Sequence, residues 1–261
     1  MNKIVLACDN IDLNIDDSIT CQYLNDDVIK KLNIKILNDT KLEIYLSQDI
    51  KIDINIDIEK NVNCNILELK ECAHSKVQIK YNLKENSYLK IDKIHNIKKI
   101  FERNIINLKG KNAKVDYILK TISKDEEKYD LTINHQAENT NSLVINNAVN
   151  VLNGNITFNV TSSVLKGKKN CIVNQNNRII NLTNNNCIIR PILLIDDVDT
   201  TANHSALIGN FKDEEYFYLQ RLGIDKELAT KLLLEGFIKS NSNYPDILEK
   251  MYKEYWRWIY E

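Results

Sequence analysis

One histidine and two cysteines in the second half of the chain are the residues best suited to metal chemistry. His204 lies in the segment 203–206 (NHSA), where a stretch of alternating residues ends. A neutral imidazole is an ordinary iron ligand, and a strand end is a place where side chains are presented to partners. Cys171 and Cys187 lie upstream, and a thiolate can also bind a metal ion. The alternative for His204 is an exposed histidine with one hydrogen bond, and for each thiol a small buried hydrophobe.

The other three histidines are weaker candidates. His135 shares a strand face with Ile133 if the alternation holds, which predicts a histidine of the core. His74 follows Cys72 by two residues, but two neighbours on one strand rarely make a metal site without ligands from elsewhere. We expect His74 and His95 to be surface residues.

Common enzyme motifs are missing from the chain. It contains no GxGxxG, GxxxxGK[ST], HExxH or GxSxG segment, and its six cysteines form no CxxC pair. Asp196, Asp197 and Asp199 resemble the carboxylates of a carbohydrate-active β-helix enzyme, but consecutive strand residues point to opposite faces. Solvated loop charges are therefore the better interpretation. Two alternative functions for this chain are a carbohydrate-active β-helix enzyme and a purely structural β-helix interaction protein.

Strands must position these residues, because apolar and polar residues alternate along most of the chain before Ile195. The segment 50–59 (IKIDINIDIE) places every isoleucine on one face, as in a half-buried strand. Strand starts recur at roughly ten-residue spacing. Six glycines are few for the tight turns of many hairpins, whereas asparagine-rich corners suit the coils of a solenoid. The pattern favours a parallel β-helix and leaves a sandwich as the alternative.

After Ile195 the apolar residues change to helical spacing. Asp213 is the expected N-cap of a first helix, Gly223 its C-terminal stop, Asp225 the cap of a second helix, and Pro245 the start of a third. We therefore expect a mostly β protein with a β-helix core domain over residues 1–209. A small helical domain over residues 210–261 should follow it.

Charge and hydropathy limit the partners and the location. The 35 basic and 36 acidic side chains are interspersed, so no basic field favours nucleic acid. No window approaches the ~20 apolar residues of a membrane span, and no secretory signal pattern opens the chain. We expect a cytoplasmic protein with no membrane or nucleic-acid partner.

Residues 174–237 resemble the C-terminal core of the SufB/SufD family, the scaffold proteins of the SUF iron–sulfur cluster assembly system. The segments that carry the resemblance keep their order and spacing, and residues 132–140 (TINHQAENT) resemble a histidine-containing coil of the same family. They are Asn181–Leu182, PILLIDDVD from Pro191, NHSA from Asn203, Ile208–Gly209, DEEYFYL from Asp213, RLGI from Arg221, Ala229, and LLLEGF from Leu232.

This resemblance implies a right-handed parallel β-helix followed by helices that dock onto a SufC-like ABC ATPase. It also implies pairing with a SufB-like scaffold or a second copy, and a transient Fe–S cluster at that interface. His204 falls on the proposed histidine ligand, and Cys171 and Cys187 are the thiols inside the matched region. No flavin-binding motif supports a flavin cofactor. The residues expected to dock the ATPase, or to support the docking surface, are Tyr216, Phe217, Leu219, Leu232, Leu233 and Phe237.

The chain departs from the family at the expected site. Ser205 follows His204 where SufB-like members carry a glutamate, and residues 175–177, at the expected position of the SufB cysteine, contain no thiol. The chain is therefore identified as a short, SufD-like, noncatalytic scaffold. It is expected to contribute one ligand to a shared site.

Overall fold

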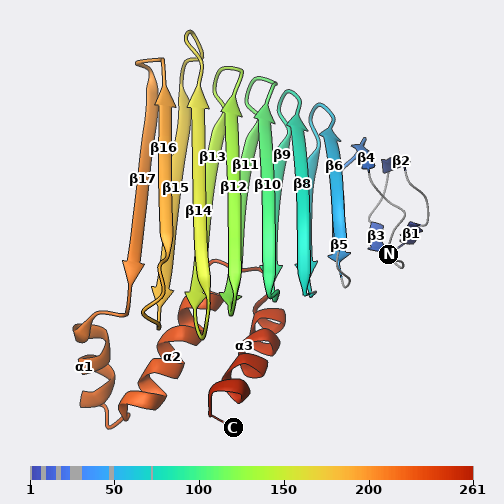
Figure 1. Cartoon of the computed structure of the whole chain (residues 1–261). Helices are drawn as coiled ribbons and strands as arrows, with labels where there is room; N and C mark the ends of the chain where they lie inside the picture. Colours follow the sequence, from blue (N-terminus) through green and yellow to red (C-terminus); the bar gives the residue numbers. More distant parts are fainter. Residues whose placement is uncertain are drawn as a thin grey trace.

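The computed structural model describes residues 2–6, 10–15, 19–23, 31–46, 50–71 and 73–260. In this part of the chain, seventeen strands are followed by three helices (Figure 1). The elements are β1 (Asn2–Leu6), β2 (Asn10–Ile15), β3 (Ile19–Tyr23), β4 (Lys31–Ile36), β5 (Thr40–Leu46), β6 (Ile50–Ile58), β7 (Asn63–Lys70), β8 (His74–Leu83), β9 (Tyr88–His95), β10 (Lys99–Leu108), β11 (Lys114–Ser123), β12 (Glu126–His135), β13 (Asn141–Asn150), β14 (Asn155–Val164), β15 (Cys171–Asn181), β16 (Ile188–Ile195), β17 (Thr200–Gly209), α1 (Asp213–Arg221), α2 (Lys226–Lys239) and α3 (Pro245–Tyr260).

Each strand pairs in parallel with the strands two positions away in the chain. The odd-numbered strands form one sheet, ordered from β1 to β17, and the even-numbered strands form a second sheet, from β2 to β16. Every coil therefore adds one strand to each sheet, and inward side chains of both sheets meet between them. This is a parallel β-helix with three C-terminal helices, which confirms the fold expected from the sequence.

Strand β6 shows how the alternation produces a coil. Ile54 and Ile56 point inward and are at most 2% exposed, whereas Lys51 and Asp53 face solvent. Ile54 pairs in register with Ile79 of β8, so each inward row is covered by the row of the next coil. The hydrophobic burial that stabilises the fold, roughly 25 cal/mol per Å² of apolar surface, is thus gained only when coils stack.

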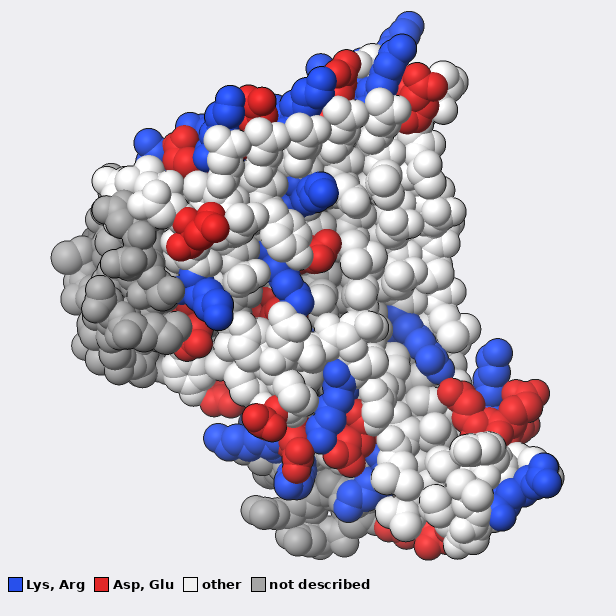
Figure 2. Space-filling view, turned by 180° about the vertical axis from the view of Figure 1, so that it is seen from behind, with Lys and Arg blue, Asp and Glu red and all other residues white. Residues whose placement is uncertain are grey.

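Asparagines occupy the corners at which the chain turns between sheets. Five of them, one per coil, adopt a left-handed backbone with φ between 55° and 61°, which asparagine tolerates better than most residues. Their side chains also bond from coil to coil; Asn112 Nδ2, for example, donates to Asn86 Oδ1 at 2.8 Å. Exposed ion pairs such as Lys60–Glu85 and Lys111–Glu138 run beside this row. Charged residues line the upper edge of the molecule in Figure 2. The five are Asn61, Asn86, Asn112, Asn139 and Asn170.

The helices pack on the outer face of the odd-numbered sheet, near the C-terminal ends of its strands (Figure 1). Outward side chains of that sheet, including Ile94 and Ile122, form one apolar cluster with Leu234, Phe237 and Leu248 of the helices. The helices therefore share a core with the β-helix. No described helix is long and apolar enough to cross a bilayer.

The N-cap of the first helix lies one residue before the predicted one. Lys212 is the N-cap and Asp213 is the first helical residue, because Glu215 reaches back and accepts the Lys212 N–H at 2.7 Å. The other predicted boundaries are confirmed. Gly223 has φ 83° after α1, and Asp225 Oδ1 accepts the N–H of the third residue of α2 at 2.8 Å.

Candidate functional site

The last coil leaves one end of the β-helix uncovered. In the part of the chain that is described, β16 and β17 are the final strands of their sheets. Their outer edges carry backbone groups that a further strand can pair with. Large apolar side chains are exposed there: Ile192 is 42% exposed, Leu194 54% and Leu207 50%. Figure 2, which views the coils from the side, shows few charged residues near the last coil.

His204 lies on this last strand and faces the interior side of the coil. It pairs in register with Gln175, which is buried, and paired residues of parallel strands share a face. The neighbouring Ser205 points the other way and donates to Asn176 Oδ1 at 3.1 Å on the outer surface. His204 is exposed because no further coil covers it. The imidazole is therefore presented at the open end of the solenoid.

Neither candidate thiol lies beside His204 in the register. Cys171 pairs with Thr200, four positions away from the Gln175–His204 pair, or about 13 Å along a strand. Its buried Sγ contacts the carbonyl of Lys168 at 3.3 Å, as a packed thiol does. Cys187 is half-buried against the main interior cluster, and this burial raises the pKa of its thiol.

The predicted docking residues divide into exposed and supporting side chains. Phe217 is 63% exposed and Leu232 42% exposed, whereas Phe237 is buried. Phe237 packs edge-on against Phe211, with ring centroids 6.4 Å apart, and the guanidinium of Arg178 lies 5.2 Å from its ring. Phe237 therefore holds the helices on the β-helix. Tyr216, Leu219 and Leu233 are half-buried.

An apolar surface surrounds Phe217 on α1. Tyr218 is 66% exposed and Leu222 63% exposed, and both line the same hollow of about 1080 Å³ as Phe217. Asn210 and Phe211, at the end of the β-helix, also line it. Exposed aromatic groups of this kind are typical of protein interfaces.

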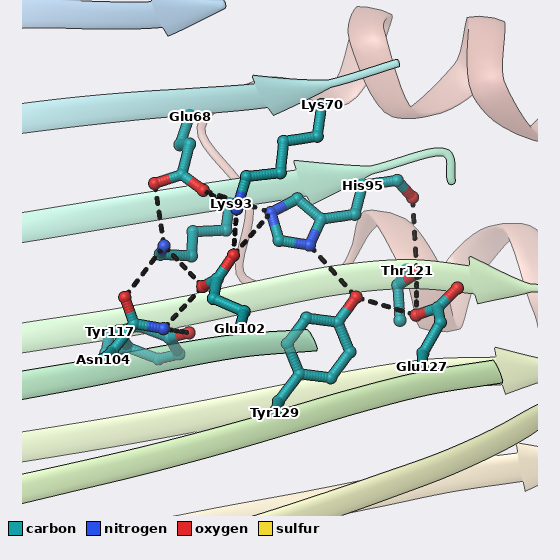
Figure 3. A network of polar contacts seen from close by, with 10 residues as sticks. All are labelled: Glu68, Lys70, Lys93, His95, Glu102, Asn104, Tyr117, Thr121, Glu127 and Tyr129. Atoms are coloured by element: carbon teal, nitrogen blue, oxygen red, sulfur yellow. Dashed lines mark hydrogen bonds and ion pairs between the residues drawn. The ribbon is translucent and has the colours of Figure 1, made fainter. Parts of the chain in front are cut away.

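A network of charged and polar side chains, which the alternation of single strands does not predict, fills part of the β-helix interior (Figure 3). All of its members point inward and are at most 3% exposed. They come from five strands, β7, β9, β10, β11 and β12. They are Glu68, Lys70, Lys93, His95, Glu102, Asn104, Tyr117, Thr121, Glu127 and Tyr129.

Two carboxylates and two ammonium groups balance each other at the centre of this network. Lys93 Nζ lies 2.8 Å from Glu68 Oε2 and 2.7 Å from Glu102 Oε1, and donates to Asn104 Oδ1 at 3.2 Å. Lys70 Nζ lies 2.6 Å from Glu68 Oε1 and also contacts Glu102 Oε2. Each carboxylate thus bridges both lysines.

The lysines of this cluster favour the ionised form of both carboxyl groups. Burial alone raises the pKa of each carboxyl, but Lys70 and Lys93 outweigh it. They hold the pKa of Glu102 at about 2 and that of Glu68 well below its ordinary value. The two carboxylates likewise raise the pKa of Lys93 against the effect of burial. Burial lowers the pKa of His95, so its imidazole is neutral.

The network continues from His95 to a third carboxyl group. His95 Nδ1 lies 3.1 Å from the Tyr129 hydroxyl, which donates to Glu127 Oε2 at 2.8 Å; Thr121 donates to the same oxygen. Burial raises the pKa of Glu127 to about 7, although hydrogen bonds from Tyr129 and Thr121 and the charge of Lys124 oppose this shift.

The prediction that His95 is a surface residue is wrong. Its strand, YLKIDKIH, places Leu89, Ile91, Lys93 and His95 on one face, and this alternation is the signal that shows its burial. His135 is buried beside Ile133, as predicted, and its two ring nitrogens lie 2.8 Å from Thr140 Oγ1 and 2.9 Å from Ser142 Oγ. Burial lowers the pKa of His135 to about 4.

The remaining charged candidates lie where the sequence placed them. His74 is exposed at the start of β8, as expected. Asp197 accepts the backbone N–H groups of Gly167 at 2.9 Å and Asp199 at 3.0 Å, so it shapes a loop. Asp196 is exposed. Both observations agree with the interpretation of these residues as loop charges.

Comparison with known proteins gives a family match over most of the β-helix. Residues 49–237 match the family model described as "SUF system FeS cluster assembly, SufBD core domain". The chain is 28% identical over 138 residues to the iron-sulfur cluster assembly protein SufD of Bacillus subtilis, a match that covers 52% of this chain and 32% of that protein. It is 40% identical over 48 residues to an iron-sulfur cluster assembly SufBD family protein of Pyrococcus horikoshii, covering 18% and 10% of the two chains. The matches thus span a third or less of these relatives' lengths.

Proposed function

The chain belongs to the SufBD family of the SUF iron–sulfur cluster assembly system, and we propose that it is a noncatalytic, cytoplasmic scaffold subunit of that system. The observation that carries this proposal is the uncovered last coil, with His204 on its interior face. A scaffold needs an edge that a partner can complete and a ligand placed at that edge. The last coil offers both within the matched family core.

The open end is the surface on which this chain pairs with a SufB-like scaffold or with a second copy. The exposed edges of β16 and β17 offer backbone donors and acceptors, and Leu194 and Leu207 supply apolar contact. A chain that adds strands here also covers His204.

His204 supplies one ligand of a transient Fe–S cluster shared across this interface. The exposed imidazole has no thiol beside it in the register, since Gln175 occupies the paired position. The partner must therefore supply the remaining ligands. Cys171 and Cys187 serve as packing residues here.

The exposed aromatic surface of α1 docks a SufC-like ABC ATPase. Phe217, Tyr218 and Leu222 line one hollow beside the end of the β-helix. A partner that fills this hollow also contacts residues that directly follow β17. ATPase movement is thereby linked to the coil that bears His204.

Cluster loading tests the role of His204. We expect His204→Ala to lower the iron and sulfide content of the complex reconstituted with a SufB-like scaffold and the ATPase. His74→Ala is the matched control, because His74 is also an exposed histidine of a strand. Equal loading of wild type and His204→Ala, with the complex intact, would refute the ligand role.

Substitutions of Phe217 and Phe237 distinguish a loss of ATPase binding from a loss of stability. We expect Phe217→Ala to weaken ATPase binding at least tenfold without changing stability, because Phe217 is largely exposed. Phe237→Ala should destabilise the chain by about 3–5 kcal/mol, because its ring is buried between the sheet and the helices. Affinity measured by calorimetry that is unchanged in Phe217→Ala would place the ATPase elsewhere.

A further inference from the structure

We propose that Glu68, His95 and Glu102 form a binding site for one divalent first-row transition metal ion, which Lys70 closes when no metal is bound. One oxygen of each carboxylate and Nε2 of the imidazole all lie within 4.8 Å of one another. His95 Nε2 is 3.4 Å from Glu68 Oε1 and 3.8 Å from Glu102 Oε2. Carboxylate oxygen and imidazole nitrogen together suit ions such as Fe²⁺ and Mn²⁺.

The three ligands are already oriented by their second atoms. Glu68 Oε2 is held by Lys93, Glu102 Oε1 is held by Lys93 and Asn104, and His95 Nδ1 faces the Tyr129 hydroxyl. Each ligand therefore has one atom fixed by the surrounding network and the other turned toward the shared position (Figure 3). Outer partners of this kind hold metal ligands in place.

A cation already sits at that position. The Lys70 ammonium is 2.6 Å from Glu68 Oε1 and also contacts Glu102 Oε2, the same two oxygens that would bind the metal. The interior thus favours a positive charge at this point, and Lys70 supplies one.

Lys70 ends β7 at the border of a hollow of about 370 Å³, which lies between the ends of β5, β7 and β9 and helix α3 and is also lined by Glu71 and Asp246. The Lys70 ammonium itself points into the interior and is fully buried. In the proposed exchange, Lys70 leaves the two carboxylates and turns toward this hollow as the metal enters the ligand set.

Two further groups fit the exchange. The Tyr81 hydroxyl is fully buried and has no hydrogen-bond partner among the described residues. It can therefore face an additional ligand such as water. A divalent ion adds one charge relative to the ammonium, and the nearby Glu127 carboxyl, joined to His95 through Tyr129, offsets this charge when ionised.

Cobalt binding to the full-length chain tests this site. Metal-free protein is titrated with Co²⁺ at pH 8 and followed by visible d–d absorption and calorimetry. We expect one Co²⁺ per chain, and at least tenfold weaker binding for His95→Gln and Glu102→Gln. Lys70→Met should bind at least tenfold tighter, because it removes the competing ammonium. His204→Ala should bind as wild type does, which separates this site from the proposed interface ligand.

Several outcomes would overturn the proposal. It fails if wild type shows no d–d bands at millimolar Co²⁺, or if folded His95→Gln binds as well as wild type. It also fails if Lys70→Met binds no more tightly than wild type. If a variant does not fold, the thermal unfolding of wild type with and without Co²⁺ tests the site. Co²⁺ should raise the midpoint temperature of unfolding, and an unchanged midpoint would reject the site.

Discussion

Replacing Lys93 with methionine tests how strongly the interior charges depend on one another. Lys93 is fully buried, and its ammonium lies within 2.8 Å of both Glu68 and Glu102. Methionine keeps a long unbranched side chain of similar volume, so packing changes little. The variant instead leaves two buried carboxylates with one ammonium, that of Lys70.

The expected loss of stability in Lys93→Met is large because the carboxylate left without its ammonium partner has no access to water. Removing one partner of a buried ion pair costs about 3–5 kcal/mol. One carboxyl group of the variant can take up a proton, and its pKa in the folded state then lies above its pKa in the unfolded state. A group of this kind stabilises the folded protein less as pH rises. The free energy of unfolding of the variant should therefore fall below that of the wild type by less at pH 5 than at pH 8.

Lys84→Met is the matched control. Lys84 Nζ lies 2.7 Å from both oxygens of Glu59, but the lysine side chain is 52% exposed. An exposed pair of this kind contributes under about 1 kcal/mol. Urea unfolding followed by circular dichroism gives both free energies. Equal losses for Lys93→Met and Lys84→Met would refute the claim that burial makes the interior charges interdependent.

Two further substitutions test the interior and the corners. Burial raises the pKa of Glu127 from 4.5 to about 7, so stability is lost as pH rises through this window. Glu127→Gln should unfold with a flatter pH profile and gain up to about 3 kcal/mol at pH 8, measured by urea unfolding at several pH values; coincident profiles would contradict this. Asn112 has φ 61°, so Asn112→Ala should cost about 1–2 kcal/mol, and Asn112→Gly less, because glycine accepts that backbone. A greater loss of thermal stability for the glycine variant would show that the Asn86 hydrogen bond, and not the backbone, dominates.

Much of the fold can be predicted from local patterns. The alternation of β6 and the scarcity of glycine identify parallel coils with asparagine corners, because period and backbone preference are properties of neighbouring residues. The C-terminal stop at Gly223 and the cap at Asp225 are local for the same reason. The predicted cap at Asp213 is wrong by one residue, because Glu215 also bonds backward to the helix start.

The interior network is not predictable in the same way. Lys93 and Glu102 occupy inward positions that an apolar pattern treats as interruptions. Their burial is acceptable only because Glu68 and Lys70, 25 and 32 residues away from their respective partners, arrive from a neighbouring coil. A charged side chain is buried at acceptable cost only when opposite charges are buried beside it. The sequence of one strand does not show which charges from other strands will lie there.

The sequence by itself therefore determined the coil, its corners and helices, and the segment that carries His204. Tertiary structure alone decided what surrounds each candidate. The strand register places Gln175 beside His204 and leaves Cys171 about 13 Å away along the sheet. The packing of the helices buries Phe237 and leaves Phe217 exposed. The physical reason is the distance in sequence over which each interaction acts. Alternation and backbone preference act between neighbours, whereas burial, charge pairing and ligand geometry depend on coils that meet only after the chain has folded.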